Sequence, residues 1–594
     1  MFKKFLITVC GSFVGSFIAI LVSMFFMMML GVAIAAGFGN IKTNIQNHSI
    51  LVLDLSGAIT ERPTGAGKID EVRYIFGEEP GISLQEIERA LDVAMLEKKI
   101  DGVVINCQGV EAAPATLRAI RKAVKKFKSS KKWVYAYGNA GYSQGDYYVA
   151  TAADSLFINP VGAVDVHGFA SCTPYMKKML DNIGINMQVV RVGAYKSAVE
   201  PYMIESMSEE NREQQQHYMG QIWGVMEAEM AAARKINLAT FDSYVNGVLV
   251  EESVDTLLKR RLVDAKKYRT EFEDMLRGLT DVEKTDDLNY ITPQELAKNF
   301  DEGEDTDGTI AVLYACGEID GAMNSSGIYS EDMVDLIREL QQDDDVKGLV
   351  LRVNSPGGSA FGSEQIWYAL EQFKKSGKTF TVSMGDYAAS GGYYISCGAH
   401  QIFADSTTIT GSIGIFGMIP CAQDLMENKI GINLEVVKTN ENADFLAMGL
   451  MSKQLTPVQL QALQNTVNQG YELFTKRCAD GRKISQDSIK AIGGGRVWDG
   501  ITAKKIGLVD QFGNLNDAIA WTAKKAGLHT GFYRVKCYPE PEDDFAAILD
   551  AYAQTRTSEQ MKKEMGVFYT YYEQAQAILR RSHVLCLLPE SELK

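Results

Sequence analysis

A serine stands between small residues in the run Ala388-Ala389-Ser390-Gly391-Gly392. The segment that follows, residues 393–397, is predicted to be helical. A strand-to-helix turn can present a serine as a nucleophile, and the glycine after it lets a backbone N–H approach a reacting carbonyl. Taken alone, the stretch is more typical of a small-residue turn packed into an α/β core.

Two side chains are candidates for the base that a serine nucleophile needs. His400 is the nearest histidine downstream. Lys196 is flanked by small and aromatic residues within residues 193–202, which is an unusual setting for a solvated lysine. A lysine acts as a base only as the neutral amine, and burial can bring the pKa of a catalytic lysine down to roughly 7–8. The alternative role for Lys196 is a surface ion pair with Glu200.

A third stretch, residues 354–359 (Asn-Ser-Pro-Gly-Gly-Ser), follows the predicted strand 349–353. Paired glycines after a strand let backbone N–H groups face a ligand at the start of the next helix, whose dipole favours an oxyanion. A plain tight turn is the alternative. Serine, amine and backbone donors together are the components of acyl transfer through a tetrahedral intermediate.

Composition narrows the classes of function. The chain has 594 residues, enough for two or more domains. A net charge of −15 argues against a nucleic-acid surface. The nine cysteines form no CxxC pair, and no HExxH pair occurs. We therefore expect no disulfide framework, no metal and no cofactor.

The N-terminus predicts a membrane anchor over residues 1–45. Lys3 and Lys4 precede a nearly uncharged run from Phe5 to Gly37, longer than the ~20 residues that span a bilayer. Lysines before the span favour a cytoplasmic N-terminus, with the rest of the chain outside. The small residues at 32–36 are the alternative, a cleavage site.

The elements that must position these residues alternate between short apolar strands and helices. Strands are predicted at 49–59, 102–106 and 133–137, and helices at 83–97 and 114–128. This alternation is typical of a mostly parallel α/β fold.

The order of elements then restarts. Residues 309–319 repeat the pattern of 49–59, residues 348–351 that of 102–105, 390–394 that of 144–148, and 430–437 that of 183–190. The offset of the last three is nearly constant, which indicates a tandem duplication of one domain. We assign residues 46–300 and 301–540 to the two repeats and residues 541–594 to a C-terminal helical extension. The extension either packs on the second repeat or forms an oligomer or membrane surface.

The two repeats have lost complementary residues. Gln144 occupies the position of Ser390 in the first repeat, and Ala443 occupies the position of Lys196 in the second. The first repeat also lacks the Pro-Gly-Gly of residues 356–358. One active site formed between the copies explains this pattern, and neither repeat alone is then active. We expect Lys196 and Ser390 of the same chain to meet, because the linker between the repeats can span that distance.

The motifs together resemble the signal peptide peptidase A (protease IV) family in its long, duplicated form. They are Ser-Pro-Gly-Gly at 355–358, Ala-Ala-Ser-Gly-Gly-Tyr at 388–393, Thr-Gly-Ser-Ile-Gly at 410–414 and Tyr-Lys-Ser-Ala-Val-Glu-Pro at 195–201. The resemblance extends from the anchor to about residue 530. It implies a crotonase-like, Clp-protease-like fold in each repeat.

The resemblance also implies roles for individual residues. Ser390 would be the nucleophile and Lys196 the general base of a Ser–Lys dyad. The backbone N–H groups of Gly358 and Gly391 would bind the oxyanion, and the Ser412 hydroxyl would orient the lysine. The specificity pocket should be apolar, and its candidate wall residues are Phe361, Ile413 and Ile415.

The expected function is a membrane-anchored serine endopeptidase that degrades signal peptides left in the membrane after export. By the resemblance it forms a homotetramer on the outer, periplasmic side of a bacterial cytoplasmic (inner) membrane, held to the lipid by one span. Two other hypotheses stay open. One is a serine esterase or thioesterase acting on membrane-associated acyl substrates, and the other is a non-catalytic membrane scaffold.

Overall fold

The computed structural model describes residues 22, 42–63, 81–283, 285–300, 307–321, 327–446 and 453–540, and the backbone of 584–587. No helix within these ranges is long and apolar enough to cross a bilayer. The predicted anchor, apart from residue 22 and its last residues, 42–45, lies outside the described residues. So does most of the predicted C-terminal extension.

The first repeat folds around a six-stranded sheet in which every neighbouring pair of strands is parallel. From edge to edge its strands are β8 (Ala265–Lys266), β5 (Ser155–Ile158), β3 (Trp133–Gly138), β2 (Ile100–Glu111), β1 (Ser49–Ala58) and β9 (Tyr290–Ile291). The short strands β4 (Gly141–Tyr142) and β6 (Ala163–Val164) pair separately. Parallel strands need helical crossovers, and the predicted α/β alternation supplies them.

The second repeat folds around an eight-stranded sheet that follows the same plan. Its main path is β17 (Val497–Asp499), β15 (Ile409–Gly411), β13 (Thr379–Ala389), β11 (Val346–Ser355), β10 (Thr309–Cys316) and β19 (Arg534–Tyr538), with β14 (Gln401–Ala404) on β13 and β18 (Gln511–Phe512) on β14. β10 and β11 are aligned as β1 and β2 are, with Ile310 opposite Gly348 and Ile50 opposite Gly102. The matching register is the structural mark of the duplication.

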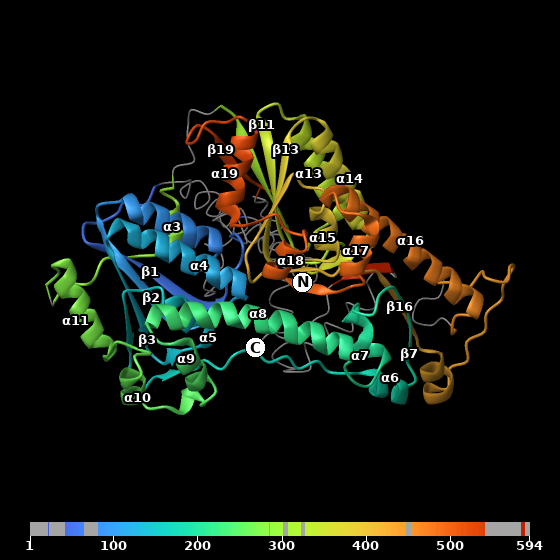
Figure 1. Ribbon diagram of the computed structural model, residues 1–594, viewed down its shortest axis with the longest axis horizontal. Helices are drawn as coiled ribbons and strands as arrows, with labels where there is room; N and C mark the ends of the chain where they lie inside the picture. Colours follow the sequence, from blue (N-terminus) through green and yellow to red (C-terminus); the bar gives the residue numbers. More distant parts are fainter. Residues whose placement is uncertain are drawn as a thin grey trace, which may run out of the picture.

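Helices cover both sheets (Figure 1). Those of the first repeat are α3 (Leu84–Leu96), α4 (Pro114–Phe127), α5 (Gln144–Ala150), α6 (Lys177–Ile183), α7 (Glu200–Met203), α8 (Glu209–Arg234), α9 (Leu238–Val245), α10 (Val254–Lys259), α11 (Arg269–Thr280) and α12 (Pro293–Ala297). Those of the second repeat are α13 (Ser330–Gln342), α14 (Ala360–Lys375), α15 (Gly391–Ser396), α16 (Pro457–Arg482), α17 (Gln486–Ile492), α18 (Gly500–Lys505) and α19 (Leu515–Lys525).

The long helices α8 and α16 are counterparts. Each has 26 residues, begins after a hydroxyl cap (Ser208 or Thr456) and ends at a lysine in the left-handed conformation. Figure 1 shows α8 running along the underside of both repeats. Its His217 Nε2 lies 3.2 Å from Thr502 Oγ1 of the second repeat. The two repeats therefore share a packed interface.

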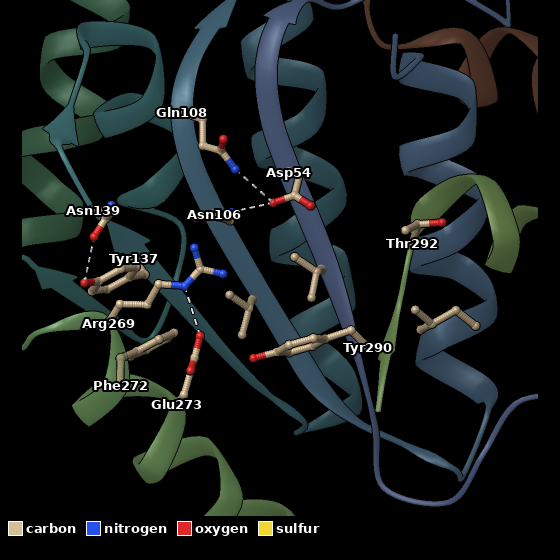
Figure 2. Close-up of a pocket in the computed structure, with 13 residues that line it drawn as sticks. Asp54, Asn106, Gln108, Tyr137, Asn139, Arg269, Phe272, Glu273, Tyr290 and Thr292 are labelled. Carbon is tan, nitrogen blue, oxygen red and sulfur yellow. Dashed lines mark hydrogen bonds and ion pairs between the residues drawn. The ribbon is translucent and has the colours of Figure 1, made fainter. Parts of the chain in front are cut away.

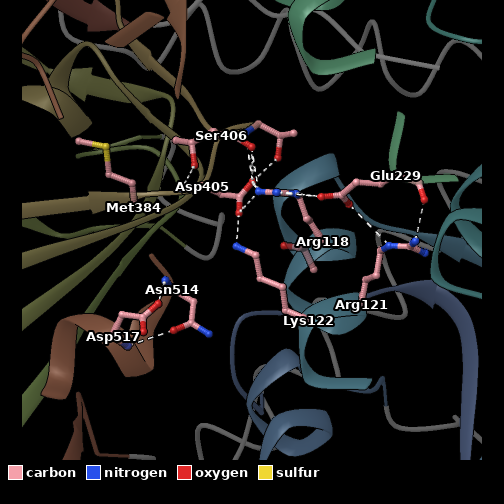
Figure 3. Close-up of polar contacts among 12 residues, drawn as sticks. Arg118, Arg121, Lys122, Glu229, Met384, Asp405, Ser406, Asn514 and Asp517 are labelled. Carbon is pink, nitrogen blue, oxygen red and sulfur yellow. Dashed lines mark hydrogen bonds and ion pairs between the residues drawn. The ribbon is translucent and has the colours of Figure 1, made fainter. Parts of the chain in front are cut away.

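Charged groups also join the repeats (Figure 3). Arg118 on α4 donates to both carboxylate oxygens of Asp405 at 2.8 Å and to Glu229 on α8. Lys122 adds a 2.6 Å bond to Asp405. Burial by itself would raise the pKa of Asp405, but Lys122 and Arg118 outweigh it and hold this pKa at about 2.

A third, four-stranded sheet contains strands from both repeats, in the order β12 (Gly357–Ser359), β20 (Val584–Leu587), β16 (Phe416–Cys421) and β7 (Asn186–Arg191). β7 of the first repeat pairs antiparallel with β16 of the second, with Arg191 opposite Phe416. Residues 433–438, the repeat counterpart of β7, form no strand. This sheet carries the end of β7 toward Lys196.

Candidate active site

Ser390 lies at the turn between β13, which ends at Ala389, and α15, which begins at Gly391. Its φ of 56° and ψ of −115° are a strained combination for a residue with a side chain. The Ser390 N–H donates to Gly411 O at 2.8 Å, and its carbonyl accepts from the Tyr394 N–H at 2.8 Å. These bonds hold the sharp turn.

Lys196 reaches the same place from the first repeat, on a loop that follows β7. The loop packs backbone to backbone against three consecutive glycines, Gly493 to Gly495. Tyr195 N–H donates to Gly494 O at 3.1 Å. A Cβ built on Gly495, whose φ is +84°, would lie 2.6 Å from the Lys196 Cα. Glycine is therefore needed here for the lysine loop to approach the second repeat.

The two side chains meet. Lys196 Nζ lies 2.8 Å from Ser390 Oγ. It also lies 3.1 Å from the Ser412 hydroxyl and 3.4 Å from the Ser412 carbonyl oxygen. Lys196, Ser390 and Ser412 are each 0% exposed. Because water cannot solvate an ammonium in this position, burial favours the neutral amine, the form that can take a proton from a serine.

The backbone conformation of Ser412 and a backbone hydrogen bond fix its position. Its φ of 50° is left-handed, and its N–H donates to Arg496 O at 2.7 Å. The Arg496 guanidinium in turn donates to the Tyr195 hydroxyl at 3.1 Å, next to Lys196. The position of Ser412 relative to the lysine is thus fixed from both repeats.

Gly358 and Gly391 lie next to each other. A Cβ built on Gly391 would come within 3.1 Å of the Gly358 backbone nitrogen. As the first residue of α15, Gly391 has an N–H with no partner inside its helix. Gly358 has a φ of +150°, and a Cβ there would lie 2.2 Å from Ile319 O. No other residue type fits this position without moving the backbone.

The direction of the Gly358 N–H follows from its neighbours. Ile319 N–H donates to Gly357 O at 2.8 Å, and Ser359 N–H donates to Ile319 O at 2.8 Å. Along an extended strand, the groups of adjacent residues point to opposite sides. The Gly358 N–H therefore points away from Ile319, toward the side on which β20 lies.

The alternative partners of the two side chains are placed elsewhere. His400 Nδ1 accepts from the Phe380 N–H at 3.1 Å, at the start of β13. At ~3.3 Å per residue, the length of β13 puts Ser390 about 30 Å away. Glu200 is buried and accepts from Ser208 at 2.6 Å and from Asn211 at 3.1 Å. Because Lys196 is buried too, a surface ion pair does not describe it.

The three predicted pocket residues differ in how far their side chains are buried. Ile413 and Ile415 lie inside the hydrophobic core of the second repeat. Phe361, at the start of α14, is 73% exposed. Their role in specificity stays a prediction.

The first repeat has the same fold but no serine nucleophile at the corresponding turn. Its counterpart turn has Ser143 as an unstrained helix cap, with a φ of −65°. The Asp146 carboxylate accepts from the Gly109 N–H at 2.9 Å and from the Val110 N–H at 3.2 Å. The Asp146 side chain thus occupies the backbone donors at the end of β2, where the second repeat has its Pro-Gly-Gly loop.

A cavity of about 270 Å³, lined by apolar and polar side chains, lies in the first repeat, apart from the dyad (Figure 2). Its polar side chains bond one another. Asn106 and Gln108 donate to Asp54 at 2.5 Å and 3.2 Å, and Arg269 donates to Glu273 at 3.0 Å. Asp54, Arg269 and Glu273, the charged groups of the cavity wall, thus each have a partner within it.

Several residues that support the site could not be identified from the sequence. Arg352 on β11 donates to Glu61 of the first repeat at 3.0 Å, and Asn354 Nδ2 donates to the same carboxylate at 3.0 Å. Asp386 on β13 accepts from the Thr116 backbone and hydroxyl, at 2.9 Å and 2.6 Å. No local pattern marks these pairs. The three consecutive glycines at 493–495, by contrast, can be recognised in the sequence.

Known proteins resemble this chain over most of its length. The sequence model of peptidase family S49 matches residues 126–283 and again residues 372–529. Protease 4 of Salmonella typhi is 36% identical over 527 residues, 86% of this chain and 84% of its own. The chloroplastic serine protease SPPA of Arabidopsis thaliana is 27% identical over 495 residues, 82% of this chain and 70% of its own.

Among solved structures, a mutant of ClpP1 from Listeria monocytogenes matches with 15% identity and a TM-score of 0.24, over 35% of this chain and 94% of its own. The fold assignment rests on the sheet topology and not on this likeness. The double match to one family confirms the predicted duplication, and it decides for a peptidase over an esterase. The chain belongs to peptidase family S49 and is a serine peptidase.

Proposed function

We propose that this peptidase cleaves apolar peptides with a Ser–Lys dyad formed by Ser390 and Lys196, and that its substrates are signal peptides left in the membrane after export. The observation that carries the proposal is the 2.8 Å approach of the Lys196 amine to the Ser390 hydroxyl, with both side chains fully buried. A buried amine beside a strained, buried serine is a costly arrangement that a purely structural role does not require.

The dyad acts in two stages. Ser390 Oγ attacks the carbonyl carbon of the scissile bond while its proton passes to Lys196 Nζ. The lysine then gives the proton to the departing amine, which leaves an acyl-enzyme ester. In the second stage Lys196 takes a proton from water, the hydroxide attacks the ester, and the proton returns to Ser390. Ser412 acts as a positioning residue that aims the amine.

The oxyanion formed in each stage is stabilised by backbone N–H groups. Gly358 and Gly391 supply donors from adjacent positions beside Ser390. A loop anchored by Ile319 presents the first donor and the start of α15 presents the second. Removing one such donor typically costs 10²–10³ in kcat.

The substrate class follows from the family resemblance and from the N-terminus. Signal peptides have apolar cores, and an enzyme tethered by residues 5–37 would meet them at the membrane. We therefore propose a single-pass anchor in the cytoplasmic (inner) membrane of a bacterium, with both repeats on the outer, periplasmic side. Extraction of the full chain from membranes by carbonate, without detergent, would contradict the anchor.

We further propose that four copies associate through the edges that the duplication leaves open. Within one chain, β7 pairs with β16. Their repeat counterparts, residues 433–438 and 169–174, form no strand here, and Val437 is 100% exposed. Pairing of residues 433–438 with residues 169–174 of the next copy would repeat the internal contact around a ring.

The proposal is tested by incubating a synthetic leucine-rich signal peptide with the wild type, Ser390→Ala and Lys196→Ala in detergent, and identifying products by mass spectrometry. We expect internal cleavage by the wild type and none by the variants. Equal turnover by Ser390→Ala would overturn the dyad. Turnover of short acyl esters without turnover of the peptide would instead support the esterase.

A further inference from the structure

The strand β13 is irregular just before it reaches Ser390. Its parallel pairing with the neighbouring strand β11 is regular up to Met384 and resumes at Ala388. Between these points one residue of β11, Asn354, faces three residues of β13, 385–387. Extra residues in one strand form a bulge, and bulges beside active sites re-aim the chain that follows them. This bulge therefore sets the direction in which β13 delivers the serine.

Asn354 connects the bulge to the loop that carries the proposed oxyanion donor. Its side-chain oxygen accepts from the Tyr387 N–H at 3.1 Å, and its side-chain amide donates to Asp386 at 3.4 Å. The next residue along β11 is Ser355, whose hydroxyl accepts from the Gly357 N–H at 3.2 Å. One side chain thus stands between the serine turn and the Pro-Gly-Gly loop, and its position relates one to the other.

Two residues of the first repeat hold this arrangement in place. The Glu61 carboxylate accepts from the Asn354 amide at 3.0 Å and from two nitrogens of Arg352, each at 3.0 Å. Thr116, in the first turn of α4, donates to Asp386 through its hydroxyl at 2.6 Å and through its N–H at 2.9 Å. Both carboxylates are close to fully buried. Their donors fix them firmly, because a lost bond would leave a buried polar group unpaired.

The bulge leaves room for the contact between the repeats. Its first residue is Gly385, and a Cβ there would lie 2.6 Å from Glu61 Oε1. The Gly385 carbonyl oxygen accepts from the Thr408 hydroxyl at 2.8 Å, which holds the bulge on its other side. A side chain at this position would push the carboxylate away from its partners.

The first repeat has no equivalent of these contacts. At the counterparts of Asn354 and Asp386 it has Gln108 and Ala140. Gln108 donates to Asp54 of its own repeat at 3.2 Å, and no register shift interrupts the pairing of β2 with β3. The bulge and its contacts across the interface therefore belong to the repeat that has the serine.

We propose that Asn354 is a positioning residue for the reaction. Glu61 and Thr116 of the first repeat hold it and the adjacent bulge, so that the serine meets both the lysine and the oxyanion loop. The first repeat then contributes twice, because it supplies the base and also sets the position of the nucleophile. The inference rests on the proposed function, since it takes Ser390 as the nucleophile. A misplacement of about 1 Å in a reacting group can cost 10²-fold in rate.

The first test removes one hydrogen bond of this arrangement without changing its shape. Thr116→Val has no hydroxyl to donate to Asp386, and Thr116→Ser keeps one. The control is Thr280→Val, which removes a buried hydroxyl that donates to the Leu276 carbonyl oxygen within α11 at 3.0 Å. The measurements are kcat and KM on the leucine-rich peptide and the rate at which a fluorophosphonate probe labels Ser390.

We expect Thr116→Val to lower kcat and the labelling rate about tenfold, because the reacting hydroxyl is misplaced. KM should stay close to the wild-type value, because no contact with the peptide is removed. Thr116→Ser should restore both rates, and Thr280→Val should keep them even where its unfolding temperature falls. Wild-type rates in a folded Thr116→Val chain, or an equal loss of rate in Thr280→Val, would overturn the positioning role.

The second test follows the bulge itself and needs no activity. In the full chain carrying Ser390→Ala, Asn354→Leu removes the acceptor of the Tyr387 N–H. Hydrogen exchange at this amide, measured by mass spectrometry, reports whether the bulge has loosened. We expect faster exchange with Asn354→Leu and with Thr116→Val, and no change with Thr280→Val. Circular dichroism establishes that each chain is folded, and Thr116→Val, the milder change, decides where Asn354→Leu does not fold.

The outcomes separate the two proposals. Unchanged exchange at Tyr387 in the folded variants would overturn the role of Asn354, whatever the activity of the wild type. If the wild type cleaves no peptide and takes no label while the exchange differences are present, the proposed function fails and the contacts that hold the bulge stand.

Discussion

Lys196 Nζ and Ser390 Oγ lie 2.8 Å apart, although 194 residues separate them in the sequence. One comes from each repeat, and neither has its catalytic partner at the equivalent position of its own repeat. The distance falls within the roughly 2.6–3.2 Å expected for proton transfer to a base. Their meeting within a single chain means that the site does not need a lysine from a neighbouring copy.

Substituting either partner should abolish activity, and the two losses should not add. We expect Ser390→Ala, Lys196→Ala and the double variant each to lower kcat by a factor of about 10³ or more, because the residues act as one unit. Rates on a fluorogenic leucine-rich peptide measure this. A double variant far less active than both single variants would show that the residues act independently. A fluorophosphonate probe should label the wild type and not Ser390→Ala.

Ser412→Ala should lower kcat about tenfold and leave KM unchanged, because the hydroxyl touches Lys196 and not the substrate. An acceptor oxygen stabilises an ammonium more than a neutral amine. The rising limb of the kcat–pH profile should therefore move to lower pH in the variant. The control is Ser376→Ala. Ser376 follows the last residue of α14, and its hydroxyl donates to the Phe373 carbonyl oxygen. If Ser412→Ala lowered stability but did not shift this limb, the role of Ser412 would be purely structural.

Gly358→Ala should lower kcat by 10²–10³ through loss of one oxyanion donor. The added Cβ would lie 2.2 Å from Ile319 O, so the loop must shift. Gly377→Ala is a matched control, because Gly377 also has a positive φ of 90° but nothing lies within 4 Å of its Cβ position. It should lose roughly 1 kcal/mol of stability and keep its activity. Equal activity of the two variants would contradict the oxyanion role.

Asp405→Asn should lower the free energy of unfolding at pH 7 by on the order of 2 kcal/mol, since the pKa of Asp405 falls from 3.8 to about 2 on folding. A depressed pKa stabilises the fold above the unfolded value of 3.8, and that stabilisation is lost as the pH falls toward 2. The difference from wild type should therefore shrink between pH 4 and pH 2. Urea unfolding measures it.

The control for this prediction is Asp344→Asn, which changes an exposed aspartate. It should leave unfolding unaltered across the same range. A difference between Asp405→Asn and wild type that stayed constant from pH 7 to pH 2 would show that the ion pairs with Arg118 and Lys122 are not its origin.

Val437→Asp should lower the oligomeric state in detergent, as measured by sedimentation, if residues 433–438 pair with a second copy. A charge there would be buried against the partner's strand. Val458→Asp is the control, because Val458 is also exposed, 69%, but lies in the first turn of α16, where an acidic residue is favourable. If both variants sediment as the wild type does, this interface is contradicted.

The sequence by itself determined the components of the site and their distribution. The duplication was readable because the same strands and turns recur in order, and Gln144 and Ala443 showed that neither copy is complete. The predicted helices at 83–97 and 114–128 agree with α3 and α4, since the Ser83 capping box of α3, the proline at the start of α4 and apolar periodicity are local signals.

The tertiary structure alone decided how these components meet. The strain at Ser390, the close approach of Lys196 to Gly495, the Arg118–Asp405 contact and the insertion of β20 beside Gly358 each join segments far apart in the sequence. Such contacts depend on how the two sheets pack, and no local pattern of residue types encodes that packing. Sequence therefore identified the serine and the lysine, and the fold supplied the 2.8 Å between them.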